Sequence, residues 1–234
     1  MDLDNATEVE ILPSIITASY GQHSADWRKS IAELQTHRIR RCALFLTGLD
    51  HAGRNECYRL LLRARKSAPF TLPFVHTRND MAHEEYLFLA TEFGADCFNL
   101  HPTRRFPLLH VLGPELRRKV FIENDSELTP LDLVDFAGIC LDLSHLEAAR
   151  LNAPDRYTAI LKLIQEYEIG ANHLSAIRRD GTGMSTHWLD DLSQLDFLEA
   201  YPKELFGRYA ALELVNPLAL QLKAISRIRG FLDL

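Results

Sequence analysis

The sequence predicts an α/β protein that folds as a single (β/α)8 TIM barrel over residues 1–234. Eight apolar runs of strand length each precede a segment with helical character. The runs are apolar throughout, which is typical of parallel strands covered on both faces. No glycine-rich phosphate fingerprint follows the first run, so the open doubly wound sheet is the weaker alternative. The length matches the compact end of the barrel class.

The eight units follow one another without an internal linker or repeat. We expect strands within 10–17, 41–48, 70–76, 95–101, 119–123, 137–145, 170–177 and 209–217. We expect helices within 24–37, 55–67, 81–94, 114–118, 128–136, 153–170, 189–201 and 218–231. The third helix should end at Gly94, because glycine is the usual residue at a helix C-terminus. The segment 128–136 has the weakest helical pattern.

Composition narrows the class of protein. The chain is 47% hydrophobic and 25% charged, which is ordinary for a globular protein. No apolar run approaches the roughly 20 residues that span a bilayer, and the acidic N-terminus is unlike a signal peptide. The four cysteines form no CxxC pair, which favours a reduced, cytoplasmic protein. The net charge of −6 disfavours nucleic acid as the main partner, because phosphate binding normally needs a basic surface.

Metal-ligand residue types stand at the carboxyl ends of the predicted strands. In a barrel these ends meet at one rim, which holds the active site. The residues are His76, His101, Glu123, Asp142 with His145, His173, His187 in the following loop, and Glu213. Each one alone is ordinarily a polar rim residue. Together, carboxylates and imidazoles crowded onto one rim would be unfavourable unless a cation neutralised them.

The ligand set therefore predicts at least one divalent metal ion. Nitrogen and oxygen ligands without thiolate suit Mn²⁺, Zn²⁺, Co²⁺ or Mg²⁺ and do not choose among them. The residues after Glu123, namely Asn124, Asp125 and Ser126, are expected to be ordinary turn residues.

These motifs resemble the xylose isomerase-like barrels, a superfamily that includes sugar isomerases and epimerases as well as AP endonucleases of the endonuclease IV type (AP endonuclease family 2). The resemblance runs from "LPFVH" to "ALELVNP". It implies a metal held by Glu123 in "FIEN", Asp142 in "CLDLSH", His173 in "NHLS" and Glu213 in "LELVNP".

The two branches of the superfamily imply different chemistry. The epimerase-like branch uses two metal-bound glutamates, here Glu123 and Glu213, as a base and acid pair next to a carbonyl. The endonuclease branch adds a second metal, here at His76 and His101. Its third site uses a D-x-H pair that reads Ser185-Thr186-His187 in this chain, which puts a third metal in doubt.

Basic and aromatic residues help to choose between the branches. The clusters Arg38, Arg40, Arg41 and Arg117, Arg118, Lys119 precede strands and should lie at the opposite rim. We expect His145, Arg179, His187, Arg178 and Trp188 to contact substrate. The arginines that follow strand ends and could face a substrate are Arg78, Arg104, Arg105, Arg178 and Arg179. Five such cations suit a sugar or sugar phosphate better than a duplex.

The first expectation is therefore a metal-dependent sugar or sugar-phosphate isomerase or epimerase. Its partner is a small molecule, with nucleic acid less favoured, no membrane, and homo-oligomerisation left open. The alternatives are a metal-dependent phosphodiesterase acting on abasic DNA and a barrel that binds a ligand without turnover.

Overall fold

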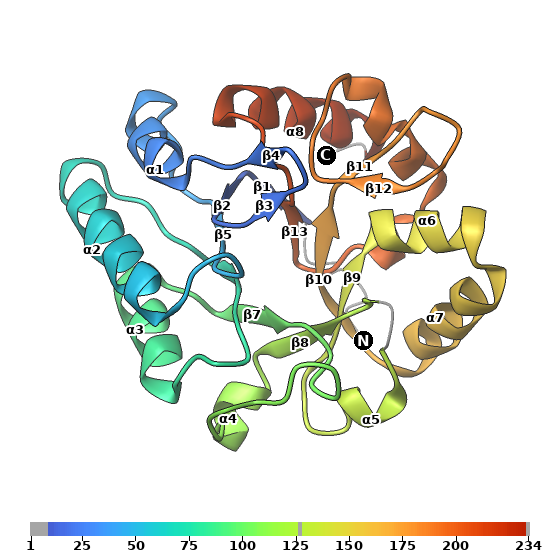
Figure 1. Ribbon diagram of the computed structural model, residues 1–234, viewed down its shortest axis with the longest axis horizontal. Coiled ribbons are helices and arrows are strands. Elements are labelled where there is room, and N and C mark those ends of the chain that lie inside the picture. The colour runs from blue at the N-terminus through green and yellow to red at the C-terminus, as the bar shows by residue number, and fades with distance from the viewer. Residues whose placement is uncertain (1–8, 126–127, 233–234) are drawn as a thin grey trace, which may run out of the picture.

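In the computed structural model, which describes residues 9–125 and 128–232, parallel strands close into a barrel surrounded by helices (Figure 1). The strands are β1 (Glu10–Leu12), β2 (Ser14–Ile16), β5 (Ala43–Phe45), β6 (Phe74–His76), β7 (Cys97–Leu100), β8 (Val120–Glu123), β9 (Gly138–Asp142), β10 (Ile169–Leu174) and β13 (Tyr209–Leu212). Their order in the sheet is β1-β13-β10-β9-β8-β7-β6-β5-β2. The predicted (β/α)8 barrel is confirmed.

The barrel closes at Pro13, which divides its first strand into β1 and β2. Proline has no backbone N–H, so it interrupts the ladder: β1 pairs with β13 and β2 pairs with β5. The buried side chain of Gln221, from the helix that follows the last strand, bridges this junction. Its amide accepts a hydrogen bond from Ser14 N at 2.7 Å and donates to Ser14 O, Leu214 O and Asn216 O at 3.0–3.1 Å.

The helices form the outer ring in Figure 1. They are α1 (Trp27–Thr36), α2 (His51–Ser67), α3 (His83–Phe93), α4 (Pro114–Arg117), α5 (Pro130–Leu133), α6 (Leu143–Asn152), α7 (Pro154–Glu166), α8 (Leu218–Leu232) and the 3-10 segments η1 (Leu192–Ala200) and η2 (Lys203–Leu205). Helix α3 ends as expected, with Gly94 in the left-handed conformation at φ +70°.

Three helical segments differ from the prediction. The weak segment 128–136 forms only the single turn α5, and 189–201 is 3-10 rather than α-helical. Helix α6 was not predicted: the chain passes from β9 directly into it. Asp142 makes this possible, because its side chain accepts a hydrogen bond from His145 N at 2.8 Å and so caps the helix.

Strand periodicity places the polar residues at the top of apolar columns inside the barrel. Side chains two apart along a strand point the same way. The inward layer includes Phe74, Phe121, Cys140, Ala171 and Ala211. Two residues further along these strands stand His76, Glu123, Asp142, His173 and Glu213. The same alternation that fills the barrel therefore points these side chains into its carboxyl-terminal mouth.

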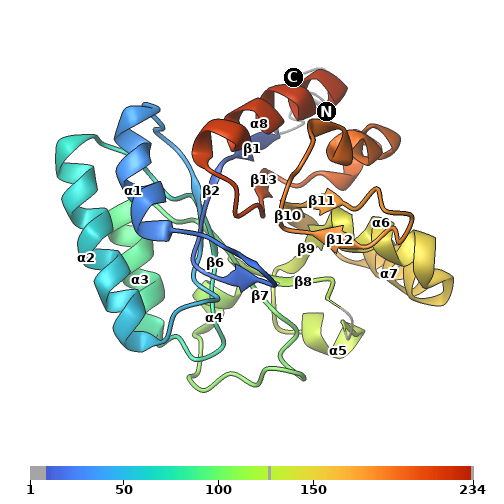
Figure 2. The ribbon, with the colours of Figure 1, turned by 45° about the horizontal axis from the view of Figure 1, so that its top comes forward.

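Two small hairpins rise beside that mouth (Figure 2). One, β3 (Ser19–Tyr20) with β4 (His23–Ser24), follows the first barrel strand and turns at Gly21, whose φ is +62°. The other, β11 (Ala176–Ile177) with β12 (Ser185–Thr186), follows β10. The glycine-rich loop after β10 is thus held by strand pairing at its base.

The basic clusters lie where the sequence predicts them. Arg41 pairs with Glu10 and Arg118 with Glu115 near the amino-terminal ends of strands, away from the site. All four cysteines are buried and unbridged. In the described ranges, no helix combines the length and the apolar character needed to cross a membrane.

Candidate metal centre

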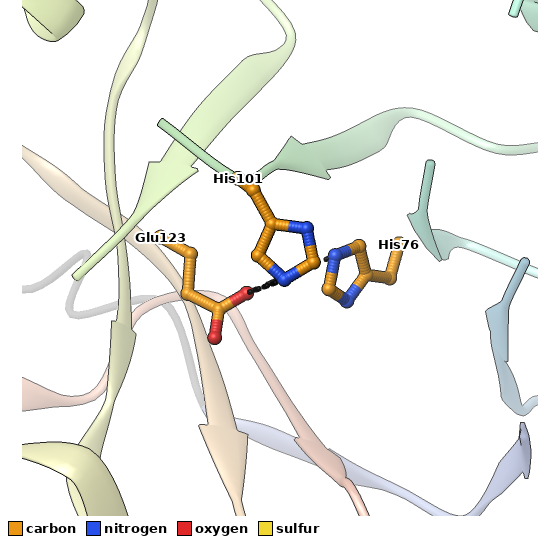
Figure 3. A group of neighbouring side chains, drawn as sticks. All are labelled: His76, His101 and Glu123. Atoms are coloured by element: carbon orange, nitrogen blue, oxygen red, sulfur yellow. Dashed lines mark ion pairs between the residues drawn. The ribbon is translucent and has the colours of Figure 1, made fainter. Parts of the chain in front are cut away.

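Glu123 at the end of β8 is the centre of the site. Its Oε2 atom lies 3.7 Å from Nε2 of both His76 and His101, and 3.5 Å from Nδ1 of His173. Figure 3 shows the first two rings on one side of the carboxylate. The Oε1 atom lies 3.7 Å from Nδ1 of His145. One carboxylate is thus faced by imidazoles from four neighbouring positions on the barrel.

A second group of ligand-type residues also includes Glu123. Glu213 follows β13, and its Oε2 is 3.5 Å from Nδ1 of His173. Asp142 and His173 end adjacent strands and are paired in register. Ligand atoms of Glu123, Asp142, His173 and Glu213 all lie within 4.8 Å of one another, and all four side chains are buried.

The spacing of these atoms suits cation binding. Distances of 3.5–3.8 Å between nitrogen and oxygen are too long for good hydrogen bonds. Two ligands each about 2.1 Å from an ion at a tetrahedral angle lie about 3.4 Å apart. Ligand atoms also lie within 4.8 Å of one another in two further groups, one of His76, His101 and Glu123 and one of His76, His173 and Glu213. These groups could hold a metal ion.

Unpaired polar atoms give an independent test of the fit. Both ring nitrogens of His76 and of His173 are buried without a hydrogen-bond partner, and so are Asp142 Oδ2 and Glu213 Oε2. Burying such atoms unpaired is strongly unfavourable. Among the described residues, no lysine or arginine forms an ion pair with Glu123, Asp142 or Glu213. A divalent cation would pair with one nitrogen of a ring and with the carboxylate oxygens, and would balance their charge.

The pKa shifts within the cluster reflect the same imbalance. Burial, reinforced by His101, lowers the pKa of His76 well below its usual value. Burial acts in the same direction on His173, but the Glu123 carboxylate reverses it and raises that pKa. Although burial raises the pKa of Glu123, the surrounding imidazoles hold it well below its usual range. Burial raises the pKa of Cys140 to about 11, so this thiol stays protonated and is a poor ligand.

Asn124 corrects one expectation from the sequence. It is fully buried, and its side chain accepts a hydrogen bond from Asp142 N and donates to Asp142 O at 3.0 Å. It therefore fixes the backbone of a ligand-type residue and is not a simple turn residue. Asp125 is also more than a turn residue. It pairs with Arg105 and lines a small cavity at the barrel mouth, called the central cavity below, together with Glu123 and Glu213. Ser126 lies outside the described residues.

His145 and His187 lie in the same cavity of about 270 Å³, which Tyr20 and Thr47 also line. Nδ1 of His187 is 3.8 Å from Glu213 Oε2 and 3.2 Å from Glu213 O. Among the described residues, neither histidine belongs to one of the three-residue ligand groups. The described residues therefore supply no ligand group for a third metal, which Ser185 had already put in doubt.

The remaining predicted contact residues lie further out. Arg178, Arg179 and Trp188 line a separate, larger cleft between the two hairpins, which shares Tyr20 and His187 with the central cavity. Arg179 is engaged by Ser193 O at 2.6 Å and by Asp196. These residues are brought near the site without reaching the ligand groups; their contact with substrate stays a prediction.

Tyr20 and His23 are site residues that the sequence reasoning missed. The Tyr20 hydroxyl donates to Glu213 Oε1 at 2.8 Å, and burial together with Glu213 raises the pKa of this phenol. Both residues lie in the hairpin after the first strand. The signal was present in "SYGQHS", in which a glycine turn is flanked by two aromatic rings.

Comparison with known proteins gives structural similarity alone. No protein-family model matches the chain, and no curated protein matches it. The crystal structure of SacUVDE, a UV damage endonuclease, aligns with a TM-score of 0.51 at 11% identity, over 97% of this chain and 100% of that one. N-acetylneuraminate lyase from Mycoplasma synoviae aligns with a TM-score of 0.41 at 8% identity, over 94% of this chain and 77% of that one, and is too distant to inform the site. The similarity to SacUVDE, at 11% identity, shows a shared barrel fold.

Proposed function

We propose that this chain is a hydrolase that cleaves phosphodiesters with two divalent cations bound at the barrel mouth. One observation carries the proposal: Glu123 belongs both to a group with His76 and His101 and to a group with Asp142, His173 and Glu213. A shared carboxylate between two groups is the arrangement of two-metal hydrolases. The four-residue group would by itself serve an isomerase with one central ion, and it does not include His76 and His101.

The residues of the two groups would hold the cations. Once bound there, such ions activate water and neutralise charge on the attacking and leaving oxygens of a phosphodiester. The absence of thiolate fits Zn²⁺, Mn²⁺, Co²⁺ or Mg²⁺. Glu123 would take part in holding both cations, because it belongs to both groups.

Other residues of the cavity would act on the substrate or on the ligand side chains. Tyr20 donates to Glu213 Oε1, which leaves Oε2 turned towards His173. Tyr20 is therefore a positioning residue. His145 and His187 line the cavity outside the ligand groups, so they are placed to hold phosphate oxygens or to move a proton at the leaving group.

A second candidate is the sugar isomerase or epimerase reaction expected from the sequence. It is favoured by the placement of Glu123 and Glu213, whose Oε2 atoms each lie 3.5 Å from Nδ1 of His173. Two carboxylates on either side of one ring nitrogen suit a base and acid pair acting on opposite faces of a substrate. This reaction needs only the four-residue group.

His101→Gln separates the two candidates. His101 belongs only to the group with His76 and Glu123 and is half-buried, so its replacement leaves the four-residue group intact. Diester hydrolysis, assayed with methyl p-nitrophenyl phosphate and Zn²⁺ or Mn²⁺, should fall at least about 100-fold, because loss of outer-shell partners alone costs about 10- to 100-fold. His110→Gln, an exposed histidine on the same loop, is the matched control.

The opposite result would favour the second candidate. In that case the wild type leaves the diester intact and exchanges a C–H proton of a ketose with solvent, and His101→Gln retains this exchange. Metal binding with neither reaction would leave a barrel that binds ligand without turnover.

A further inference from the structure

The cleft between the two hairpins adjoins the candidate metal centre. It measures about 790 Å³ and shares Tyr20 and His187 with the smaller central cavity. Figure 2 shows β11 and β12 beside the barrel mouth, with the hairpin of β3 and β4 across from them. A substrate whose phosphate lies in the central cavity can therefore extend into this cleft.

Two pairs of stacked aromatic rings line the hairpin cleft, and one of them also lines the central cavity. Tyr20 stacks on His187 with ring centroids 3.7 Å apart. His23 stacks on Trp188 with centroids 4.3 Å apart and planes only 4° from parallel. The indole of Trp188 is fixed further by donating from Nε1 to Asp190 at 2.8 Å. Rings held in this way offer a flat surface to another flat, aromatic group.

The charges in the cleft disfavour a phosphate there. Asp180, Asp190 and Asp191 line it together with Arg178 and Arg179, so its carboxylates outnumber its guanidinium groups. Arg179 is already engaged by Asp196, and Arg178 lies 4.0 Å from Asp180. An uncharged ring with polar edges suits this surface better than an anion.

A second cleft of about 490 Å³ lies on the other side of the central cavity, with which it shares Thr47 and His101. Phe106 and Leu109 give it an apolar wall. A phosphodiester has two ester arms, and two clefts flanking the candidate metal centre can receive one arm each.

The rim does not favour a long polyanion. The four rim arginines that line these clefts are each within 4.0 Å of a carboxylate, in the pairs Arg78–Asp80, Arg105–Asp125, Arg178–Asp180 and Arg179–Asp196. The whole chain carries a net charge of −6. Affinity for nucleic-acid polymers comes largely from many unpaired cations that neutralise successive phosphates. Among the described residues that line these two clefts, no arginine is unpaired in this way.

We infer that the hairpin cleft binds the base of a small, nucleotide-sized phosphodiester, with His23 and Trp188 as its stacking platform. The inference rests on the proposed function and narrows its substrate to one or two nucleosides rather than duplex DNA. The base lies against the aromatic pair, the phosphate lies among the ligand groups, and the second arm enters the cleft beside His101.

The first experiment compares two diesters on the metal-loaded enzyme. The p-nitrophenyl ester of thymidine 5′-monophosphate carries a base, and methyl p-nitrophenyl phosphate does not. In Trp188→Ala, the KM of the thymidine ester should rise about tenfold relative to the KM of methyl p-nitrophenyl phosphate. A change of this size is in line with base stacking on aromatic side chains. Trp27→Phe, a buried tryptophan of α1, is the matched control. An unchanged ratio in Trp188→Ala would overturn the inference.

The second experiment needs no turnover. The chain has two tryptophans, so Trp27→Phe leaves Trp188 as the fluorophore. Adenosine monophosphate should quench it at concentrations where ribose 5-phosphate does not. Absent quenching would refute the base site even if methyl p-nitrophenyl phosphate is hydrolysed, whereas quenching without hydrolysis would refute the proposed function alone. Tighter competition by a 20-nucleotide oligomer than by adenosine monophosphate would overturn the small-substrate assignment.

Discussion

Replacement of His76 by leucine should stabilise the metal-free protein and weaken the metal-loaded one. His76 is 1% exposed and both of its ring nitrogens lack a hydrogen-bond partner. Its ring packs against Phe45 at a centroid distance of 5.4 Å and against His173 at 5.0 Å. Leucine has a similar volume and no polar atom, so it can keep the contact with Phe45 without leaving buried nitrogens unpaired.

The magnitude follows from these contacts. A buried polar atom without a partner costs about 1–3 kcal/mol, and His76 has two of them. Lost ring contacts offset part of this gain, so we expect the free energy of unfolding without metal to rise by about 1–3 kcal/mol. An ion present at about 100 times its Kd stabilises the folded state by about 2.7 kcal/mol. Since His76→Leu removes a ligand, the variant should lose much of one such contribution.

Urea unfolding followed by circular dichroism, with EDTA and with Zn²⁺, measures both effects. Phe45→Leu is the control: Phe45 contacts His76 but is not a ligand, so this substitution should destabilise by roughly 1–2 kcal/mol under both conditions. If His76→Leu destabilises the protein in EDTA as much as Phe45→Leu does, the unpaired nitrogens of His76 do not destabilise the metal-free protein. Their assignment to a cation site would then be refuted.

Three further predictions concern the supports of the site. Arg54→Met removes the buried partner of Glu85 and should cost about 3–5 kcal/mol at pH 7. Burial raises the pKa of Glu85, but hydrogen bonds from Arg54 lower it by more, so the net shift is downward. The pair therefore stabilises the folded protein at pH values above the unfolded pKa of about 4.3, and this stabilisation is lost as the pH falls through the folded pKa. Urea unfolding at pH 3 should therefore show a smaller difference than at pH 7, and an equal difference would contradict the pairing. Gln221→Leu leaves buried backbone groups at the barrel junction unpaired and should destabilise by at least about 2 kcal/mol by thermal or urea unfolding, whereas a neutral effect would mean that the junction does not need it. Asn124→Leu should lower metal affinity about 10- to 100-fold in calorimetric titration, because it frees the backbone of Asp142; unchanged affinity would refute this positioning role.

The barrel and the rim residues could be predicted because two periodicities agree. Apolar strands alternate with helical segments along the whole chain, and in a parallel barrel every strand ends at the same rim. Glu123 and His173 were therefore predictable as neighbours although they are 50 positions apart in the sequence. The period of two along each strand directs them inward above Phe121 and Ala171.

The hairpins and the role of Asn124 could not be predicted in the same way. Short hairpins depend on backbone geometry at single residues such as Gly21, and their aromatic rings meet only through tertiary packing. Asn124 has ordinary turn composition, and only the fold shows that it binds the backbone of Asp142 on the neighbouring strand. The helix predicted over 128–136 was too long because the apolar residues Leu131 and Val134 remain exposed and do not hold it to the core.

The number of ions bound per chain tests the central claim most directly. Native mass spectrometry of the protein reconstituted with Zn²⁺ measures it without assuming a substrate. We predict two ions for the wild type and one for His101→Gln, because that substitution removes only the group formed with His76 and Glu123. A wild type that binds a single ion, with the same count in His101→Gln, would contradict the two-metal centre and the phosphodiesterase proposal built on it.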